Sequence, residues 1–250
     1  MALLTTRVDT APENFVGSLI ALQRRMAELQ APVQVTWLNH HSITPALANA
    51  AEALREVDVC GVDGQFLKWL LRHPARTSAD LVVPLLLRCD ETIGRVLAIG
   101  GPSDRSAALS SALGEVAGRP VAVVAVDGYH GLLRGEDLRQ LVRAVDPDLL
   151  LVGLGAGLQE QVLLEGGSAM NRGYAMTCGG FLDQVLQDGY YPGWAYPLRL
   201  NWLVRLAREP RRLWRRYTVG AVVALARGRG WRKVTAGVPG IVAHARMCGP

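Results

Sequence analysis

Short apolar segments with the composition of strands alternate along this chain with longer segments that have the apolar periodicity of helices. Segments that are apolar throughout are typical of strands in a parallel sheet whose two faces are both covered. Alternation with helices indicates right-handed crossover connections. We therefore predict an α/β fold, a mostly parallel, Rossmann-like sheet with helices on both faces. The predicted strands are Val33–Leu38, Val59–Val62, Arg95–Ile99, Pro120–Val126, Asp148–Leu154 and Tyr174–Thr177.

The length and composition of the chain indicate one large domain. Half of the 250 residues are hydrophobic and a fifth are charged, which is typical of a globular chain and argues against disorder. This length suffices for a substantial core, with or without an appendage. The predicted helices are Phe15–Leu29, Thr44–Val57, Asp80–Leu87, Ser103–Val116, Glu136–Val145 and Gln159–Gly166.

Basic residues are concentrated near the end of the chain. Residues 189–250 contain 12 Lys and Arg against one acid, whereas residues 1–188 contain 15 basic and 21 acidic residues. A basic segment beside an acidic body suits an anionic partner, either a phosphate group, a lipid surface or nucleic acid. Nucleic acid is the least favoured, because the segment has few aromatic residues spaced for base stacking and no recognition motif.

The basic segment has helical periodicity over residues 196–217, where tryptophans and leucines alternate with arginines. Pro210 is expected to end one helix and begin another. We therefore predict an α/β body at 1–194 and a helical, basic appendage at 195–250. Its tryptophans need a partner surface, and a homo-oligomer is one way to supply it.

The cysteines and the N-terminal segment indicate a cytoplasmic setting. Four widely spaced cysteines, without a Cys-x-x-Cys pair, predict neither a zinc site nor a disulfide framework. The first residues lack the pattern of a signal peptide, and no apolar window approaches the roughly 18–20 residues that cross a bilayer. Any contact with the cytoplasmic membrane is therefore expected to be peripheral.

Polar residues and glycines fall shortly after the predicted strands. The carboxyl ends of parallel strands meet at one edge of the sheet, where open α/β folds bind ligands. We therefore expect these residues to converge on a binding site. They are Asn39, Asp63, Gly64, Gly100, Gly101, Asp127, Gln159, Glu160 and Asp183.

Asp63 is the strongest catalytic candidate among them. A carboxylate at a strand end beside glycine has room for a substrate hydroxyl and can act as a general base. The pair Asp63-Gly64 is also typical of a turn, and the two residues alone do not separate these interpretations.

Seven short motifs, taken in order over roughly residues 30–217, resemble the WecG/TagA/CpsF glycosyltransferase family. Each motif is weakly specific, and their common order makes the resemblance strong. The motifs are Val62-Asp63-Gly64, Arg76-Thr77-Ser78-Ala79-Asp80, Ile99-Gly100-Gly101, Asp127-Gly128-Tyr129, Gln159-Glu160, Asp183 and Glu209-Pro210-Arg211.

The resemblance implies an inverting transferase that needs no metal or other cofactor. Such an enzyme moves an N-acetylhexosamine-type sugar from a UDP donor to a polyprenyl-diphosphate-linked acceptor, in cell-surface or exopolysaccharide synthesis. Asp63 is then the base, and Gln159 and Glu160 lie on the nucleotide side. The C-terminal appendage helps to complete the site and touches the membrane. Further substrate-binding residues are expected at Asn39, Gly64, Asp80, Gly100, Gly101, Asp127 and Asp183, with one or more of Arg205, Arg211 and Arg212 facing the diphosphate.

Three departures from the family pattern indicate a divergent subgroup. Trp37 stands where the family has threonine, Gly157-Leu158 replaces Pro-Lys before the Gln-Glu pair, and Tyr190-Tyr191-Pro192 replaces Arg-Ala-Pro. These differences leave open a second interpretation, a catalytically inactive member that acts as a membrane or polysaccharide-assembly scaffold.

Two other motifs are predicted not to serve as cofactor sites. Asp146-Pro-Asp148 has the Asp-x-Asp pattern of metal-dependent sugar transferases, but it precedes its strand and is therefore expected at the opposite edge of the sheet. Gly153-x-Gly155-x-Gly157 lacks the spacing of a dinucleotide-binding loop.

Overall fold

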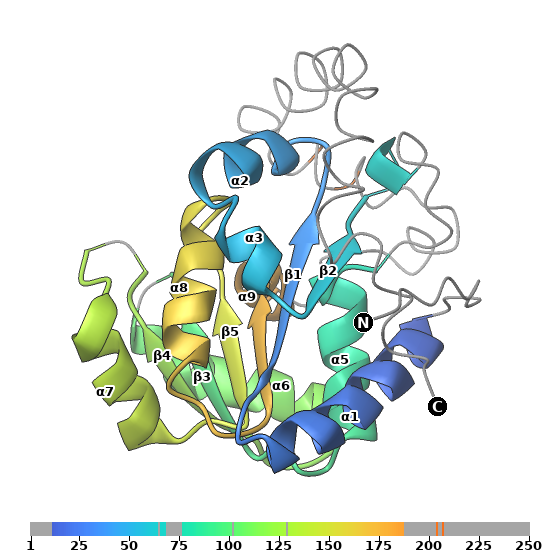
Figure 1. Cartoon of the computed structure of the whole chain (residues 1–250). Coiled ribbons are helices and arrows are strands. Elements are labelled where there is room, and N and C mark those ends of the chain that lie inside the picture. Colours follow the sequence, from blue (N-terminus) through green and yellow to red (C-terminus); the bar gives the residue numbers. More distant parts are fainter. Residues whose placement is uncertain are drawn as a thin grey trace.

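The computed structural model describes residues 12–64, 66–68, 77–101, 103–128 and 130–187, with Val204 and Ala207. In this part of the chain, six strands form one sheet in the order β2-β1-β6-β5-β3-β4, and every pairing is parallel (Figure 1). The α/β prediction is confirmed. The helices and arginines expected over 196–217 fall outside the described residues, apart from Val204 and Ala207. The strands are β1 (Val33–Leu38), β2 (Val59–Val62), β3 (Arg95–Ile99), β4 (Ala122–Val126), β5 (Leu149–Val152) and β6 (Tyr174–Thr177).

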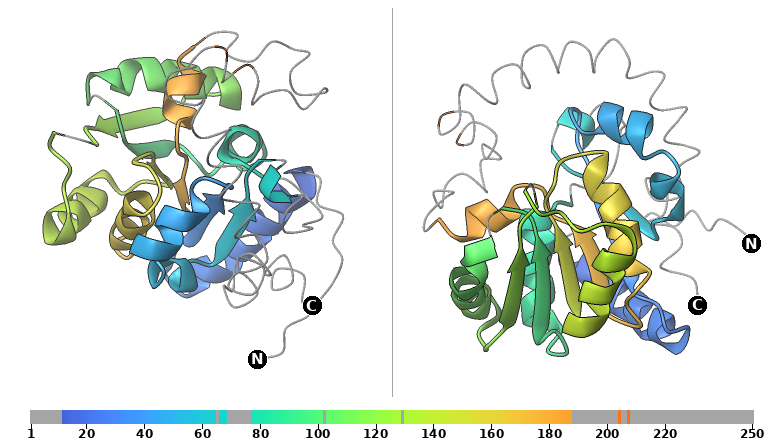
Figure 2. Two further views of the ribbon diagram at one scale, coloured as in Figure 1. Left: turned by 90° about the horizontal axis from the view of Figure 1, so that it is seen from above. Right: turned by 90° about the vertical axis from the view of Figure 1, so that its left-hand side faces the viewer.

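Helices cover both faces of the sheet (Figure 2). Successive strand residues point to opposite faces, so in β5 Leu149 and Leu151 enter one core cluster while Leu150 and Val152 enter the other. One face packs against α1 (Pro12–Glu28), α5 (Ala79–Cys89), α6 (Ser106–Ala117) and α9 (Phe181–Val185). The other face packs against α2 (Ile43–Asn49), α3 (Ala53–Glu56), α7 (Gly135–Val145) and α8 (Leu158–Gly167).

Four strands have the predicted bounds, whereas two helical segments differ from the prediction. The single helix expected over Thr44–Val57 is two helices, because the backbone at Ala50 leaves the helical conformation (φ −142°, ψ 31°). The carbonyl of Asn49 at this break accepts a 2.7 Å hydrogen bond from the Gln161 side chain. The segment expected over Ser103–Val116 begins with a 3₁₀ turn, η1 (Ser103–Arg105), before α6.

The strand order creates a crevice near the middle of the sheet. The chain runs from β1 outward to β2, crosses to β3 and β4, and returns through β5 to β6, which lies between β1 and β5. The loop after β1 leads to α2 on one face, whereas the loop after β6 leads to α9 on the other. Loops that separate in this way open a ligand crevice at the carboxyl edge of a parallel sheet.

No helix in the described residues has both the length and the apolar character required to span a bilayer.

Candidate active site

A cavity of about 270 Å³ lies at this crevice, on the carboxyl edge of the sheet. The loops after β1, β2, β5 and β6 and the first turns of α5 and α9 form its walls. Four of the predicted site residues line it together: Asn39, Asp63, Asp80 and Gln159. Side chains that are separated by up to 120 positions in the sequence therefore share one cavity.

Asp63 directly follows β2 and is half-buried at the cavity wall. Its backbone N–H donates a 2.7 Å hydrogen bond to the carbonyl of Leu38, which continues the pairing of β2 with β1 beyond the strand end. Gly64 then has a φ of +86°, a conformation that glycine adopts readily. The turn and the cavity-facing carboxylate therefore coexist at this pair, so the two interpretations of the motif do not exclude each other.

Asn39 shapes the turn that joins β1 to α2. Its Oδ1 accepts hydrogen bonds from the backbone N–H groups of His41 (3.0 Å) and Ser42 (2.9 Å). The Ser42 hydroxyl in turn accepts a 2.8 Å hydrogen bond from the Asn39 backbone N–H. This reciprocal pairing fixes the side chain of Asn39 at the cavity wall without a contribution from a ligand.

The structure separates the roles of Gln159 and Glu160. Glu160 is fully buried, and its carboxylate accepts hydrogen bonds from Gly157 N–H (2.6 Å), Gln159 Nε2 (2.9 Å) and Thr36 Oγ1 (3.3 Å). A carboxylate only accepts, so the amide nitrogen of Gln159 must face it. Gln159 lines the cavity, and its Oε1 has no hydrogen-bond partner in the described part of the chain. Glu160 therefore orients Gln159, whose carbonyl oxygen remains as an acceptor.

Thr36 and Thr177, which the sequence analysis did not single out, extend this network across the sheet. Their hydroxyl oxygens are 2.9 Å apart. Because the Thr36 proton is directed to Glu160, the Thr177 hydroxyl donates to Thr36 and is left with lone pairs that can only accept. Thr177 lines the cavity. It is the last residue of an apolar strand, the position at which a polar residue reaches a ligand site in this fold.

The other expected site residues lie elsewhere along the carboxyl edge. Gly100 and Gly101 follow β3 and Asp127 follows β4, and none of them is among the residues that line this cavity. A Cβ at Gly100 would lie 2.7 Å from the carbonyl oxygen of Gly153, so glycine there permits close packing of the loops after β3 and β5. Asp127 accepts a 2.9 Å hydrogen bond from the His130 backbone N–H.

Asp183 lies in α9 and forms an ion pair with Arg105 of η1. This pair joins α9 to η1. Arg205, Arg211 and Arg212 fall outside the described residues. The substrate-binding roles expected for these residues stay predictions.

The comparison with protein families decides the class of enzyme. The family model described as the glycosyl transferase WecG/TagA/CpsF family matches residues 1–235. The chain belongs to the WecG/TagA/CpsF family. It is therefore a glycosyltransferase, and the resemblance inferred from the ordered motifs is confirmed. A search of curated proteins found no match to the chain.

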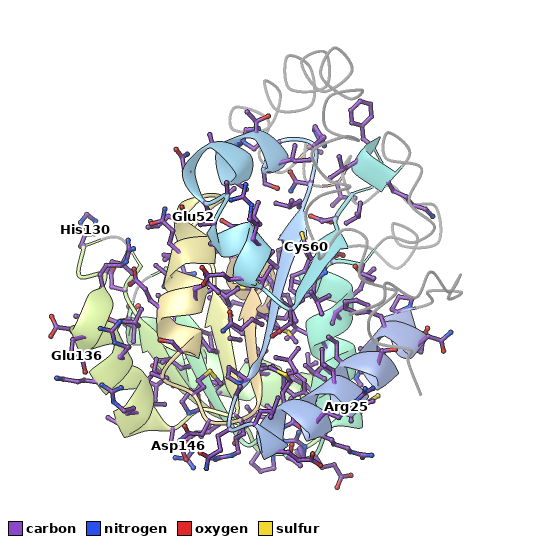
Figure 3. All side chains as sticks on the ribbon, viewed as in Figure 1. Arg25, Glu52, Cys60, His130, Glu136 and Asp146 are labelled. Atoms are coloured by element: carbon purple, nitrogen blue, oxygen red, sulfur yellow. The ribbon has the colours of Figure 1, made fainter. Side chains whose placement is uncertain are left out.

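The Asp-x-Asp segment of this glycosyltransferase lies at the amino edge of the sheet, as expected (Figure 3). Arg172 donates hydrogen bonds to Asp146 (3.1 Å) and Asp148 (3.3 Å). Asp148 also accepts hydrogen bonds from the backbone N–H groups of Gly94 and Arg95, both at 3.0 Å. These acids therefore fasten loops at the edge opposite to the cavity. Among the described residues, no group of three or more His, Cys, Asp or Glu side chains is placed to hold a metal ion.

Two buried cysteines of the transferase are expected to resist alkylation. Burial raises the pKa of Cys178, at the cavity wall, to about 12, and burial with the nearby Glu160 also raises the pKa of Cys60. A thiol with a raised pKa is protonated at pH 8 and unreactive. Mass spectrometry after iodoacetamide treatment should find Cys89, which is exposed, modified and the buried Cys60 and Cys178 unmodified. All three should react in denaturant, and rapid native labelling of Cys178 would contradict this assignment.

Proposed function

We propose that this transferase moves an N-acetylhexosamine-type sugar from a UDP donor to a polyprenyl-diphosphate-linked acceptor, with inversion at the anomeric carbon. The observation that carries the proposal is the convergence of Asn39, Asp63, Asp80 and Gln159 on one cavity at the carboxyl edge of the sheet. The product belongs to bacterial cell-surface or exopolysaccharide synthesis.

Asp63 is the proposed base of the reaction. Its carboxylate takes the proton from the acceptor hydroxyl as that oxygen attacks the anomeric carbon, on the face opposite to UDP. The bond between the anomeric carbon and the diphosphate oxygen breaks in the same step, and its electron pair leaves with UDP. Positive groups stabilise the charge that grows on the diphosphate, the role predicted for Arg205, Arg211 and Arg212. The oriented carbonyl of Gln159 is available to the nucleotide side of the donor.

The basic appendage is the proposed contact with the inner face of the cytoplasmic membrane. Its support is the excess of Lys and Arg over residues 189–250, together with the tryptophans spaced among them. The lipid-linked acceptor is held in that membrane, so a peripheral enzyme meets it at the surface. An inactive scaffold would share this contact and differ in turnover.

A thermal-shift experiment tests the donor class. UDP, UDP-GlcNAc and UDP-ManNAc, each at about 100 times Kd, should stabilise the protein by about 2.7 kcal/mol, which corresponds to roughly 5–10 °C in Tm. GDP, ADP and NAD should have little effect. Gln159→Ala should reduce the shift, whereas Gln161→Ala should retain it. Gln161 lies on the same helix as Gln159, but it bonds Asn49 and Arg134 and is not among the residues that line the cavity.

A cooperative melt that does not respond to uridine nucleotides would contradict the proposed donor. Binding of UDP-sugars without transfer to any of several lipid-linked acceptors would favour the scaffold.

A further inference from the structure

Trp37 occupies an unusual position in the wall of the cavity. It lies on β1, opposite Gly61 of β2, and only 6% of its surface is exposed. A Cβ at Gly61 would lie 2.4 Å from Cδ1 and 2.6 Å from Nε1 of the indole. The absence of a side chain at Gly61 therefore gives the indole its place across β2. Gly61 in the neighbouring strand therefore accommodates a bulky aromatic ring at a position where the family has threonine.

The indole N–H of Trp37 is buried and has no hydrogen-bond partner in the described part of the chain. An indole nitrogen is a donor only, and a buried donor without a partner is destabilising. Thr77, whose Oγ1 lies 2.5 Å from the same Cβ position at Gly61, is also buried and does not pair with the indole. The donor therefore has no acceptor among the described residues, and because Trp37 lines the cavity, a ligand there is one source of an acceptor.

Resting on the function proposed above, we propose that Trp37 is a specificity-determining residue that donates a hydrogen bond from its indole N–H to an oxygen of the transferred sugar. Gly61 precedes Asp63 by two residues, and side chains two apart on a strand share a face. The indole over Gly61 thus lies on the side of the cavity that Asp63 lines. The sugar carries the atom attacked by the hydroxyl that Asp63 deprotonates, so the sugar is the part of the donor beside both residues.

Gln159, which lines the same cavity, has complementary chemistry. Gln159, at the start of α8, offers an acceptor, and Trp37, at the end of β1, offers a donor. Both side chains are more than nine-tenths buried. A donor molecule that spans the cavity satisfies both groups, with the nucleotide toward Gln159 and the sugar toward Trp37. Trp37 then contributes to affinity for the UDP-sugar and contributes little to affinity for UDP.

Titration calorimetry with Trp37→Phe tests this inference. Phenylalanine keeps an aromatic ring over Gly61 and removes the N–H. The Kd for UDP-GlcNAc or UDP-ManNAc, whichever the wild type binds more tightly, should rise about tenfold, while the Kd for UDP should change less than twofold. Thr77→Val is the matched control, because it removes the other unpaired group over Gly61, which is not among the cavity-lining residues. It should leave both values unchanged.

Three results would overturn the assignment of Trp37. These are an unchanged UDP-sugar Kd in Trp37→Phe, an equal loss of affinity for UDP and the UDP-sugar, and a loss in Thr77→Val as large as that in Trp37→Phe. A wild-type protein that binds no sugar nucleotide would instead overturn the proposed function, and the role of Trp37 with it. Binding of UDP-sugars that is indifferent to Trp37 leaves the proposed function intact.

Discussion

Replacing Asp63 with asparagine is expected to lower the rate of sugar transfer by about 10²–10⁴-fold, the usual contribution of a general base. The fold should survive, because asparagine keeps the backbone hydrogen bond to Leu38 and the half-buried residue lies at the cavity wall. Asparagine has the same shape and cannot take the proton from the acceptor hydroxyl. The measurement is kcat for UDP release with a lipid-linked acceptor, alongside a thermal melt and the Kd for the UDP-sugar.

Asp146→Asn is the matched control for this prediction. Asp146 lies at the opposite edge of the sheet and has a φ of +46°, a conformation that asparagine tolerates well. Transfer by this variant should be normal. Near-normal transfer by a folded Asp63→Asn protein would exclude Asp63 as the base, and a selective loss of UDP-sugar affinity would make it a binding residue.

The fold was largely predictable from the sequence because each strand is marked by the residues within it and directly beside it. Segments such as Arg95–Ile99 and Tyr174–Thr177 are apolar runs bounded by turn-forming residues, and their bounds agree with the structure. The break in Thr44–Val57 was not predictable from composition, because an Ala-rich segment favours continuous helix. Its cause is tertiary, since Gln161 of α8 bonds the carbonyl freed at Asn49.

The candidate site was only partly predictable, because local patterns do not specify which strands are neighbours. Every residue that follows a strand was expected at one cavity. The order β2-β1-β6-β5-β3-β4 instead places Asp63 and Gln159 around the crevice, and Gly100 and Asp127 beyond it. Trp37 was not identified as a site residue from the strand pattern, because an aromatic residue in an apolar strand is typical of the core. Its position at the cavity depends on Gly61 in the next strand.

Replacing Glu160 with glutamine is expected to destabilise the protein by about 2–3 kcal/mol and to weaken binding of UDP-sugars. The carboxylate accepts three hydrogen bonds, from Gly157, Gln159 and Thr36. An amide in its place brings an N–H group against at least one of them, and an unsatisfied buried donor costs about 1–3 kcal/mol. In a chain of this size the loss corresponds to roughly 4–12 °C in Tm, which calorimetry or circular dichroism measures directly.

The weaker binding follows from the freedom that the substitution gives to Gln159. With glutamine at position 160, the Gln159 amide can rotate so that its carbonyl faces inward and its NH₂ group faces the cavity. The acceptor that the wild type presents to the donor nucleotide is then lost. Glu136→Gln, at an exposed acid on α7, should leave both Tm and affinity nearly unchanged. A Glu160→Gln protein with normal stability would show that the buried network is dispensable, and one with lower stability but normal affinity would show that Gln159 does not meet the nucleotide.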